Sequence, residues 1–367
     1  MTKVCHLTSA HPRYDVRIFE KECVSLSKYN FEVNLIVNDD LPNEVKSNVN
    51  IISTGYTPKN RLDRIVNSKK KILKLANDLD ADVYHLHDPE LLPLIRPFVK
   101  KGKKVIFDAH EDTAEQIMDK EWIPYQIRRL VSLLYSQYSK KALKRATAII
   151  TVTPQLVTKF SKFNRTVMVT NYPILSSFKE FDYIGNFNSP TICFAGGISE
   201  QWRHKEIINA IEGLPNVKYV LAGNADSSYL EQLKTLNGWK KVDYLGKISH
   251  SDVESIQKSA VAGMAINYAN QIKGQGTLGN TKLFEYMAAG IPVICTNYIL
   301  WEDIINKNGC GITVDPNSTD EIKKAIQYIL DNPKISEKMG KNGRIAVEKE
   351  FSWANEEVKL IELYKSL

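Results

Sequence analysis

Strand-like and helix-like segments alternate along the whole chain, and this alternation constrains the fold more than any other feature of the sequence. Short apolar runs such as KVCHLTS (3–9) and KKVIFDAHE (103–111) are typical of buried strands. Between such runs lie segments with apolar residues at helical spacing, for example RIFEKECVSLSKY (17–29). This alternation predicts an α/β protein with doubly wound, parallel sheets.

The alternation is interrupted once, by the irregular stretch NYPILSSFKEFDYIGNFNSP (171–190), and then starts again. A chain of 367 residues is long for one core and suits two domains. We therefore predict two Rossmann-like domains that face a central cleft. The predicted boundaries are 1–172 for the N-terminal domain, 173–189 for a linker, 190–350 for the C-terminal domain and 351–367 for a final helix.

The composition favours a globular cytoplasmic protein. Hydrophobic residues make up 43% and charged residues 25% of the chain. No run of about 18 apolar residues occurs, so no transmembrane helix is expected. The chain starts directly with a strand-like segment, so no signal peptide is expected. Five scattered cysteines without a CxxC pair predict reduced thiols, with no disulfide framework and no zinc site.

The positive charge is concentrated in the first half of the chain. Residues 1–172 contain 28 Lys and Arg against 19 Asp and Glu, whereas residues 173–367 contain 21 against 23. No acidic residue occurs in 122–179, a region that includes the basic amphipathic segment YQIRRLVSLLYSQYSKKALKR (125–145). Such a helix either lies on an anionic membrane or packs its apolar stripe on its own domain. A nucleic-acid partner is not expected, because no known module pattern is present.

Two Rossmann-like domains raise the question of a nicotinamide enzyme, and the glycines argue against one. The turn after the first strand reads TSAHPRYDVR (8–17) and contains no glycine, so the GxGxxG fingerprint is absent there. After TICFAGG, at the start of the second half, only Gly196 and Gly197 are present. A dinucleotide-dependent dehydrogenase is therefore not predicted.

The stretch GQGTLGNTKLFEYMAAGIPVICTN (274–297) carries a different binding signal. A glycine-rich polar loop exposes backbone N–H groups, and a helix that starts behind it is a ready anion site. Lys282 falls in the first helical turn, and Glu285 follows three residues later. A phosphate site beside a carboxylate that can accept two hydroxyl groups indicates a nucleotide.

Motifs in both halves of the chain resemble one family of transferases. NTKLFEYMAAGIPVI (280–294) and FAGGIS (194–199) are similar to motifs of the family 4 glycosyltransferases of the GT-B fold. In the first half HPRYDVRIFEKECVSLSKYNFEVNLI (11–36), DVYHLHDPELLPL (82–94) and VIFDAHE (105–111) resemble the bacterial branch that builds surface polysaccharides.

The resemblance implies a retaining hexosyltransferase that uses a nucleotide-diphospho-sugar, expected to be a UDP-sugar. The acceptor would be a saccharide or lipid-linked saccharide of a capsule, exopolysaccharide or O-antigen pathway. The enzyme would need no cofactor and no metal. It would work in the cytoplasm, with expected peripheral contact to the inner face of the membrane through the basic 122–179 region. By the same resemblance, the final helix 351–367 would cross back to the N-terminal domain.

By the same resemblance, Glu285 would bind the ribose hydroxyls, and Lys282 with the backbone of 276–281 would bind the diphosphate. The other residues expected at the donor are Gly196, Gly197, Arg203, Lys205, Gly246, Thr277, Asn280, Thr281 and Leu283. The chain departs from the family at two points. Gly197 stands where many members have an arginine, which leaves Arg203, His204 and Lys205 as alternatives for the second cation. Thr277 stands where an E-x7-E pair would have its first acid.

In the first half the resemblance makes His110 the histidine that touches hydroxyls of the donor sugar. Asp108 and Glu111 flank it and complete the expected catalytic group. The residues expected on the acceptor side are His11, Asp15, Arg17, His87 and Asp88. The D-x-D pattern of Asp80 and Asp82 lies at a helix-to-strand turn, where aspartates are common, and is interpreted as structural.

Two alternatives to a glycosyltransferase stay open from the sequence. A sugar-nucleotide epimerase of the same fold would need no acceptor. A non-catalytic partner subunit would keep the fold without the chemistry, and the departures at Gly197 and Thr277 keep this alternative in view.

Overall fold

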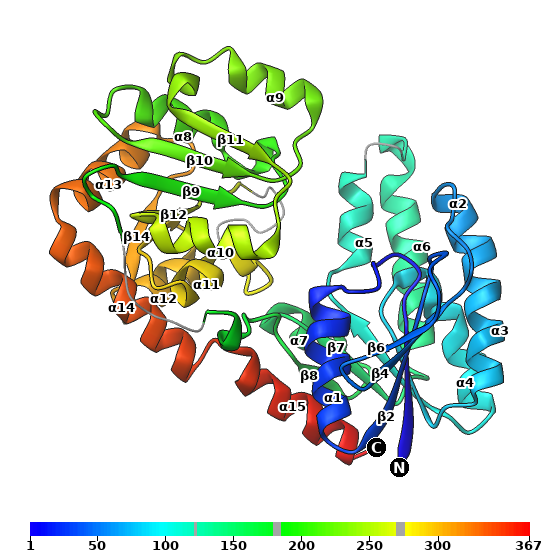
Figure 1. Ribbon diagram of the computed structural model, residues 1–367. Helices are drawn as coiled ribbons and strands as arrows, with labels where there is room; N and C mark the ends of the chain where they lie inside the picture. Colours follow the sequence, from blue (N-terminus) through cyan, green and yellow to red (C-terminus); the bar gives the residue numbers. More distant parts are fainter. Residues whose placement is uncertain (121–122, 179–184, 269–275) are drawn as a thin grey trace. The chain divides into compact units, whose positions relative to one another are not determined.

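The computed structural model describes residues 1–120, 123–178, 185–268 and 276–367, and the chain divides into two compact α/β units (Figure 1). Unit 1 contains Met1–Asn171 and Trp353–Leu367, and unit 2 contains Tyr172–Ser352. Part of the predicted linker, 179–184, lies outside the described residues. Unit 1 is thus built from two stretches of chain that are separated in sequence by the whole of unit 2.

The described part of unit 1 has one sheet of eight strands, in the order β3-β4-β2-β1-β5-β6-β7-β8. The strands are β1 (Thr2–Leu7), β2 (Phe31–Val37), β3 (Glu44–Lys46), β4 (Val49–Ser53), β5 (Val83–Leu86), β6 (Lys104–Ala109), β7 (Ala148–Thr151) and β8 (Thr166–Met168). All pairs are parallel except β3 with β4 at the edge. The short exposed β3 was not predicted, because three residues, EVK, carry no readable alternation.

Helices cover this sheet in two layers. The segments are η1 (Val16–Cys23), α1 (Val24–Lys28), α2 (Arg61–Asp63), η2 (Arg64–Ser68), α3 (Lys69–Leu79), η3 (Pro89–Leu94), α4 (Ile95–Lys100), α5 (Thr113–Gln116), η4 (Ile117–Asp119), α6 (Tyr125–Leu143), α7 (Pro154–Phe160) and α15 (Trp353–Lys365). Ile72 of α3, Phe98 of α4 and Leu143 of α6 share one hydrophobic core with the strand residues Leu86 and Phe107. The other layer contains η1, α1 and α15, which pack against one another.

The C-terminal helix α15 is tied into unit 1 by polar contacts to segments far away in the sequence. The Glu356 carboxylate accepts a hydrogen bond from the Thr170 amide (2.8 Å), and the Trp353 indole N–H donates to Ser25 Oγ (3.0 Å). Near its end, Tyr364 Oη lies 2.9 Å from Nδ1 of His85. Tyr364 is buried, so α15 forms part of the core of unit 1.

The described part of unit 2 has one sheet of six parallel strands, in the order β11-β10-β9-β12-β13-β14. The strands are β9 (Thr191–Ala195), β10 (Lys218–Ala222), β11 (Val242–Gly246), β12 (Ala262–Ala265), β13 (Val293–Thr296) and β14 (Gly311–Val314). The helical segments are η5 (Leu175–Ser177), η6 (Glu200–Trp202), α8 (His204–Glu212), α9 (Ser227–Lys234), η7 (Asn237–Lys241), α10 (His250–Ser259), α11 (Thr281–Ala288), α12 (Ile299–Asn308), α13 (Thr319–Asp331) and α14 (Pro333–Lys349). The helices on the two sides of the sheet close two separate hydrophobic cores.

This architecture confirms the prediction of two doubly wound α/β domains with parallel sheets. All five cysteines are buried free thiols, as the unpatterned spacing predicted. Among the helices that the structure describes, none combines the length and the hydrophobicity of a membrane span.

Candidate functional site

In unit 2 the predicted anion loop leads into α11, whose start is fixed by an asparagine. The Asn280 side chain accepts a hydrogen bond from the Lys282 amide (3.1 Å) and so caps the helix. In the loop, the Gly279 amide donates to Thr277 Oγ1 (3.0 Å), and the carbonyl of Thr277 accepts from the Trp301 indole (2.8 Å). The loop residues from 276 onward are therefore held in place, and the positive end of the helix dipole lies behind them.

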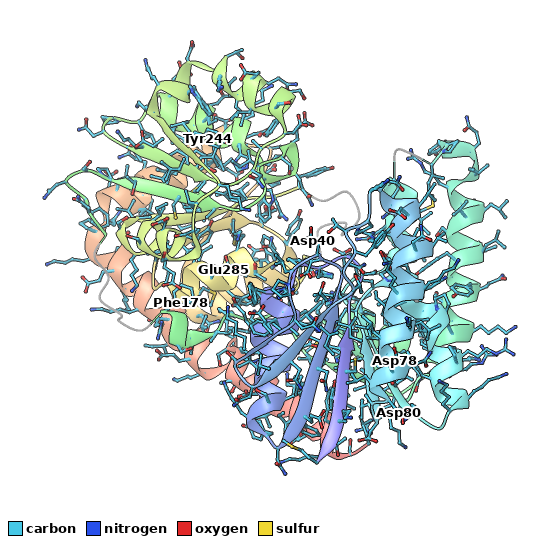
Figure 2. All side chains as sticks on the ribbon, turned by 45° about the vertical axis from the view of Figure 1, so that its right-hand side comes forward. Asp40, Asp78, Asp80, Phe178, Tyr244 and Glu285 are labelled. Atoms are coloured by element: carbon cyan, nitrogen blue, oxygen red, sulfur yellow. The ribbon has the colours of Figure 1, made fainter. Side chains whose placement is uncertain are left out.

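Lys282 and Glu285, predicted to contact different parts of a ligand, contact each other. Lys282 Nζ lies 2.8 Å from Glu285 Oε2, and the two side chains are 17% and 28% exposed. Lys282 also lies against the turn after β9, because a Cβ added at Gly196 would stand 2.9 Å from its Cε. Figure 2 shows Glu285 on α11 within unit 2. The structure therefore brings Gly196, Lys282 and Glu285 together.

The turns that follow β9, β10 and β11 approach one another through glycines. Gly223 has a φ of +135°, and a Cβ there would lie 1.8 Å from the carbonyl oxygen of Gly196. Its amide donates to the carbonyl of Gly246 (2.7 Å). Gly223 was not named from the sequence, although its place after the strand VKYVLA is the signal that could have found it. Carboxyl ends of parallel strands are where open α/β sheets bind ligands.

Arg203, His204 and Lys205, the three alternatives for the second cation, have different surroundings in the structure. His204 is fully buried, and its Nδ1 lies 2.9 Å from Tyr219 Oη, so its side chain cannot reach a ligand. Burial lowers the pKa of His204 to about 3. Arg203 stacks on the Tyr268 ring at 4.8 Å and hydrogen-bonds Asn317. Lys205 is exposed on α8.

The other predicted donor residues fall into two groups. Gly197, where a Cβ would meet nothing within 4 Å, follows Gly196 in the turn after β9, and Thr281 is the first residue of α11. Leu283 differs, because its side chain is fully buried in a hydrophobic core of unit 2. Only the backbone of Leu283 is left for a ligand.

In unit 1 a buried ion pair between Asp108 and Arg17 organises the predicted catalytic region. Arg17 donates from Nε and Nη2 to the two oxygens of Asp108, both at 2.9 Å, and from Nη1 to the Val169 carbonyl (3.0 Å). Burial alone would raise the pKa of Asp108, but the Arg17 charge, together with the contacts of His110 and His87, outweighs it and holds this pKa well below its usual value. Asp108 is therefore ionised, and its charge is balanced by Arg17.

His110 follows β6 and lies at the edge of this pair. Its Nε2 is 3.4 Å from Asp108 Oδ2, and its side chain is 24% exposed. Burial lowers the pKa of His110 to about 4, although Asp108 acts in the opposite direction. His110 is consequently a neutral imidazole at pH 7, able to donate or accept one hydrogen bond at each nitrogen.

The predicted acceptor-side residues after β1 and β5 also meet. His11 lies between two carboxylates, with Nδ1 3.2 Å from Asp15 and Nε2 3.5 Å from Asp88, and its ring centroid is 5.8 Å from that of His110. Asp15 caps η1 by accepting from the amides of Arg17 and Ile18 at 2.9 Å. The hydrogen bond to Asp15 raises the pKa of His11.

Three residues of this predicted group do not reach the surface. Arg17, His87 and Asp88 are 5%, 1% and 2% exposed, and the first two contact Asp108 inside unit 1. His87 Nδ1 lies 3.3 Å from Asp108 Oδ2.

Glu111, which was predicted beside His110, is exposed and accepts a hydrogen bond from Gln116. It lies at one side of a pocket that is also lined by Asp112, Tyr135 and Lys159.

The D-x-D pattern has the structural role that was expected. Asp80, labelled in Figure 2, ends α3 with a φ of 49°. Its carboxylate pairs with Lys103 at 2.8 Å. Asp82 accepts from the Lys3 amide at 2.9 Å. Both precede β5, at the edge of the sheet away from the carboxyl ends of the strands.

Family models and solved structures agree with this architecture. The model described as Glycosyltransferase Family 4 matches residues 22–169, and the model described as Glycosyl transferases group 1 matches residues 179–346. An uncharacterized glycosyltransferase of Methanocaldococcus jannaschii, MJ1069, is 24% identical over 186 residues, which cover 49% of this chain and 45% of the relative. The chain thus spans about half the length of the curated relatives that it matches.

Sucrose-phosphate synthase from Thermosynechococcus elongatus superimposes with a TM-score of 0.77 at 15% identity, over 100% of this chain and 99% of that one. The Anabaena protein Alr3699/HepE in complex with UDP-glucose gives a TM-score of 0.72 at 13% identity, over 100% of both chains. Residues 22–169 and 179–346 thus match two glycosyltransferase family models, and the chain has the two Rossmann-like domains of the GT-B fold.

Proposed function

We propose that this protein is a retaining glycosyltransferase that moves a hexosyl group from a UDP-sugar to a saccharide or lipid-linked saccharide in surface-polysaccharide synthesis. The observation that carries the proposal is the Lys282–Glu285 pair at the start of the Asn280-capped helix, against the glycine turn at Gly196. The choice of uridine is supported by the similar Anabaena structure, which is a complex with UDP-glucose.

The groups of unit 2 suit a nucleoside diphosphate. Lys282 carries a positive charge, and the N–H groups at the start of α11 can donate hydrogen bonds. Together they form a fixed arrangement that can bind the negative charge of a diphosphate. Glu285, 28% exposed beside them, can accept hydrogen bonds from two neighbouring hydroxyl groups, as a ribose offers. Lys282 and the N–H groups of α11 would compensate the negative charge of the diphosphate. We therefore propose that the transfer step needs no metal ion.

In the proposed reaction the bond between the sugar C1 and the diphosphate oxygen breaks as the acceptor oxygen bonds to C1 on the same face. The acceptor proton passes to an oxygen of the leaving diphosphate, so no protein base takes it. Lys282 stabilises the negative charge that grows on the diphosphate. In unit 1, neutral His110 is suited to hydrogen-bond a sugar hydroxyl, and its Nε2 lies 3.4 Å from Asp108 Oδ2.

Calorimetric titration with UDP, GDP, CDP and ADP, without added metal, tests the nucleotide site. We expect UDP to bind selectively and Glu285→Ala to weaken it by roughly 10- to 100-fold, since hydrogen bonds to a charged group contribute about 1.5–3 kcal/mol. Glu231→Ala is the matched control, because Glu231 also forms an i,i+3 pair with a lysine, Lys234, on an exposed helix of unit 2. Equal UDP affinity in the two variants, or no binding at all, would reject the assignment.

We also propose that α6 contacts an anionic membrane, which would bring the protein to a lipid-linked acceptor. Three leucines of this helix, Leu130, Leu133 and Leu134, are each more than half exposed. The same helix carries exposed Arg129 and Lys140. Of the predicted basic region, Trp122 and Lys179 lie outside the described residues. Exposed leucines beside cations are the combination that inserts into the interface of an anionic bilayer.

Co-sedimentation with vesicles that contain phosphatidylglycerol checks this contact. We expect the wild type to bind them and to bind pure phosphatidylcholine vesicles far less, because the cations contribute about 1 kcal/mol each near an anionic surface. Leu130→Ser/Leu134→Ser should lose most of the binding. The control Leu41→Ser/Leu245→Ser removes two other leucines of similar exposure, 53% and 47%, outside the helix and should leave binding unchanged. Equal binding by the two double variants would contradict the proposal.

A further inference from the structure

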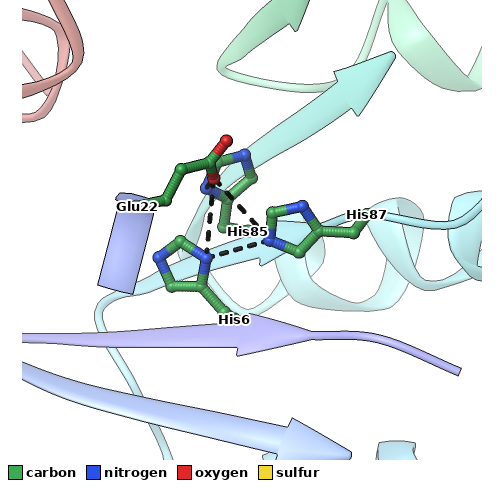
Figure 3. Close-up of side chains that lie close together, drawn as sticks. All are labelled: His6, Glu22, His85 and His87. Atoms are coloured by element: carbon green, nitrogen blue, oxygen red, sulfur yellow. Dashed lines mark hydrogen bonds and ion pairs between the residues drawn. The ribbon is translucent and has the colours of Figure 1, made fainter. Parts of the chain in front are cut away.

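Three histidines and one glutamate meet in the interior of unit 1 (Figure 3). His6 is on β1, His85 is on β5 directly opposite it in the sheet register, His87 follows β5, and Glu22 comes from η1. None of the four is more than 1% exposed. Side chains of these types are seldom gathered in a core without a polar partner or an ion to satisfy them.

The four side chains point one atom each at a common centre. Glu22 Oε2 lies 3.9 Å from His6 Nδ1, 3.6 Å from His85 Nδ1 and 3.9 Å from His87 Nε2. His6 Nδ1 and His87 Nε2 are 2.9 Å apart, and all four atoms lie within 4.8 Å of one another. A tetrahedral zinc ion bonds such atoms at about 2.0–2.2 Å, which places neighbouring ligands roughly 3.3–3.6 Å apart. The separations found here bracket that value.

The cluster is not satisfied by the protein alone. Neither oxygen of Glu22 has a hydrogen-bond partner in the described part of the chain. The ligand atom of His85, Nδ1, also lies 2.9 Å from Tyr364 Oη, a contact that a bound ion would replace. Glu22 Oε1 has Arg17 Nε as its ionic neighbour at 3.2 Å, while Oε2 is the oxygen that faces the three histidines. Arg17 also donates to both oxygens of Asp108, so it compensates the charge of Glu22 only in part. The buried Oε2 still needs either a proton or a cation beside it.

The outer contacts of two histidines match those of metal ligands. A histidine that binds a metal through one nitrogen usually has a hydrogen-bond partner at the other, often a carboxylate. His87 would bind through Nε2, and its Nδ1 lies 3.3 Å from Asp108. His6 would bind through Nδ1, and its Nε2 lies 3.4 Å from Tyr364 Oη.

We propose that His6, Glu22, His85 and His87 form a structural site for a divalent transition-metal ion, with zinc as the best match. Three imidazoles and one carboxylate are ligands that zinc takes in tetrahedral geometry. All four ligands come from the protein and all are buried, so no position is open for substrate. The ion would join β1, β5 and η1, and through His87 it would hold Asp108.

A second group, His87, Asp108 and His110, is also close enough to bind an ion. It fits less well, because Arg17 already occupies both oxygens of Asp108. The zinc site is separate from the nucleotide groups of unit 2. Its test therefore does not depend on the proposed function.

Metal analysis of untagged protein, purified without chelator, is the first measurement. We expect one zinc ion per chain. Protein unfolded with chelator and refolded with Co²⁺ should show the visible absorption bands of tetrahedral cobalt, because ligands of this kind bind the ion as the site forms. A folded wild-type chain that holds neither zinc nor cobalt would overturn the proposal and leave a shared proton as the partner of Glu22.

Variants locate the ion. Glu22→Gln and His85→Asn should lose the bound metal and the cobalt bands. His204→Asn should keep both, since His204 is an equally buried histidine whose Nε2 has no hydrogen-bond partner among the described residues, but it lies in unit 2. Metal that persists in Glu22→Gln and His85→Asn would place the ion elsewhere and reject the site. If these variants do not fold, the metal content and cobalt spectrum of the wild type decide the question.

Discussion

Arg17→Met is expected to destabilise unit 1 by about 3–5 kcal/mol, because it leaves the buried Asp108 carboxylate without its cation. Arg17 donates two hydrogen bonds to that carboxylate and one to the Val169 carbonyl, all within 3.0 Å. Methionine fills much of the same volume but offers none of these donors. Thermal and denaturant unfolding of the purified variant measure the loss.

The control for this prediction is Arg13→Met in the same unit. Arg13 also pairs with two carboxylates, but Asp39 and Glu44 are 19% and 33% exposed and can be hydrated when the arginine is removed. Arg13→Met should therefore lower the free energy of unfolding clearly less than Arg17→Met. The double variant Arg17→Met/Asp108→Leu should recover part of the stability, since the unpaired charge is gone. A loss for Arg17→Met no larger than for Arg13→Met would show that Asp108 does not depend on Arg17.

Lys282→Ala is expected to lower kcat by about 10²- to 10³-fold, the effect of removing one fixed group that stabilises charge in a transition state. In the proposed reaction negative charge grows on the leaving diphosphate, and Lys282 is the cation at the start of α11 beside Gly196. Lys282→Arg keeps the charge and should retain more activity. The assay is product formation from a UDP-sugar and a saccharide acceptor at saturating donor.

Lys234→Ala serves as the matched control for Lys282→Ala. Lys234 forms the same kind of i,i+3 pair, with Glu231, but the two side chains are 44% and 70% exposed. We expect its kcat to equal that of the wild type. An unchanged kcat in Lys282→Ala would contradict the role of this lysine, provided that unfolding temperatures show both variants folded.

The sequence predicted the fold well because its signals are local. Apolar strand runs and helical spacing lie within single elements, and GNTKLFEYM contains both the cap and the charged pair of its helix. It could not show that Lys282 and Glu285 pair with each other, because side-chain direction decides that contact. It also placed Leu283 at the donor, although the periodicity of α11 turns this side chain into the core.

The residues that sequence reasoning missed are brought together by the register of the sheet. His6 and His85 are 79 residues apart and become neighbours only because β1 pairs with β5. Glu22 joins them through the packing of η1, and no spacing in the sequence marks it as a ligand. A different pairing, of β5 with β6, places Leu86 opposite Phe107 and so explains why His87, predicted on the acceptor side, lies next to Asp108.

The return of α15 to unit 1 has a consequence for how the chain is made. Residues 1–171 emerge from the ribosome long before Trp353–Leu367, because the whole of unit 2 is synthesised in between. During that time Ser25 lacks its contact with Trp353, and His85 lacks its contact with Tyr364. Domains generally fold as they emerge, N-terminal first, and incompletely packed ones expose apolar surface. Here the first domain to appear is the last to be completed, after the second domain has already had the time to fold.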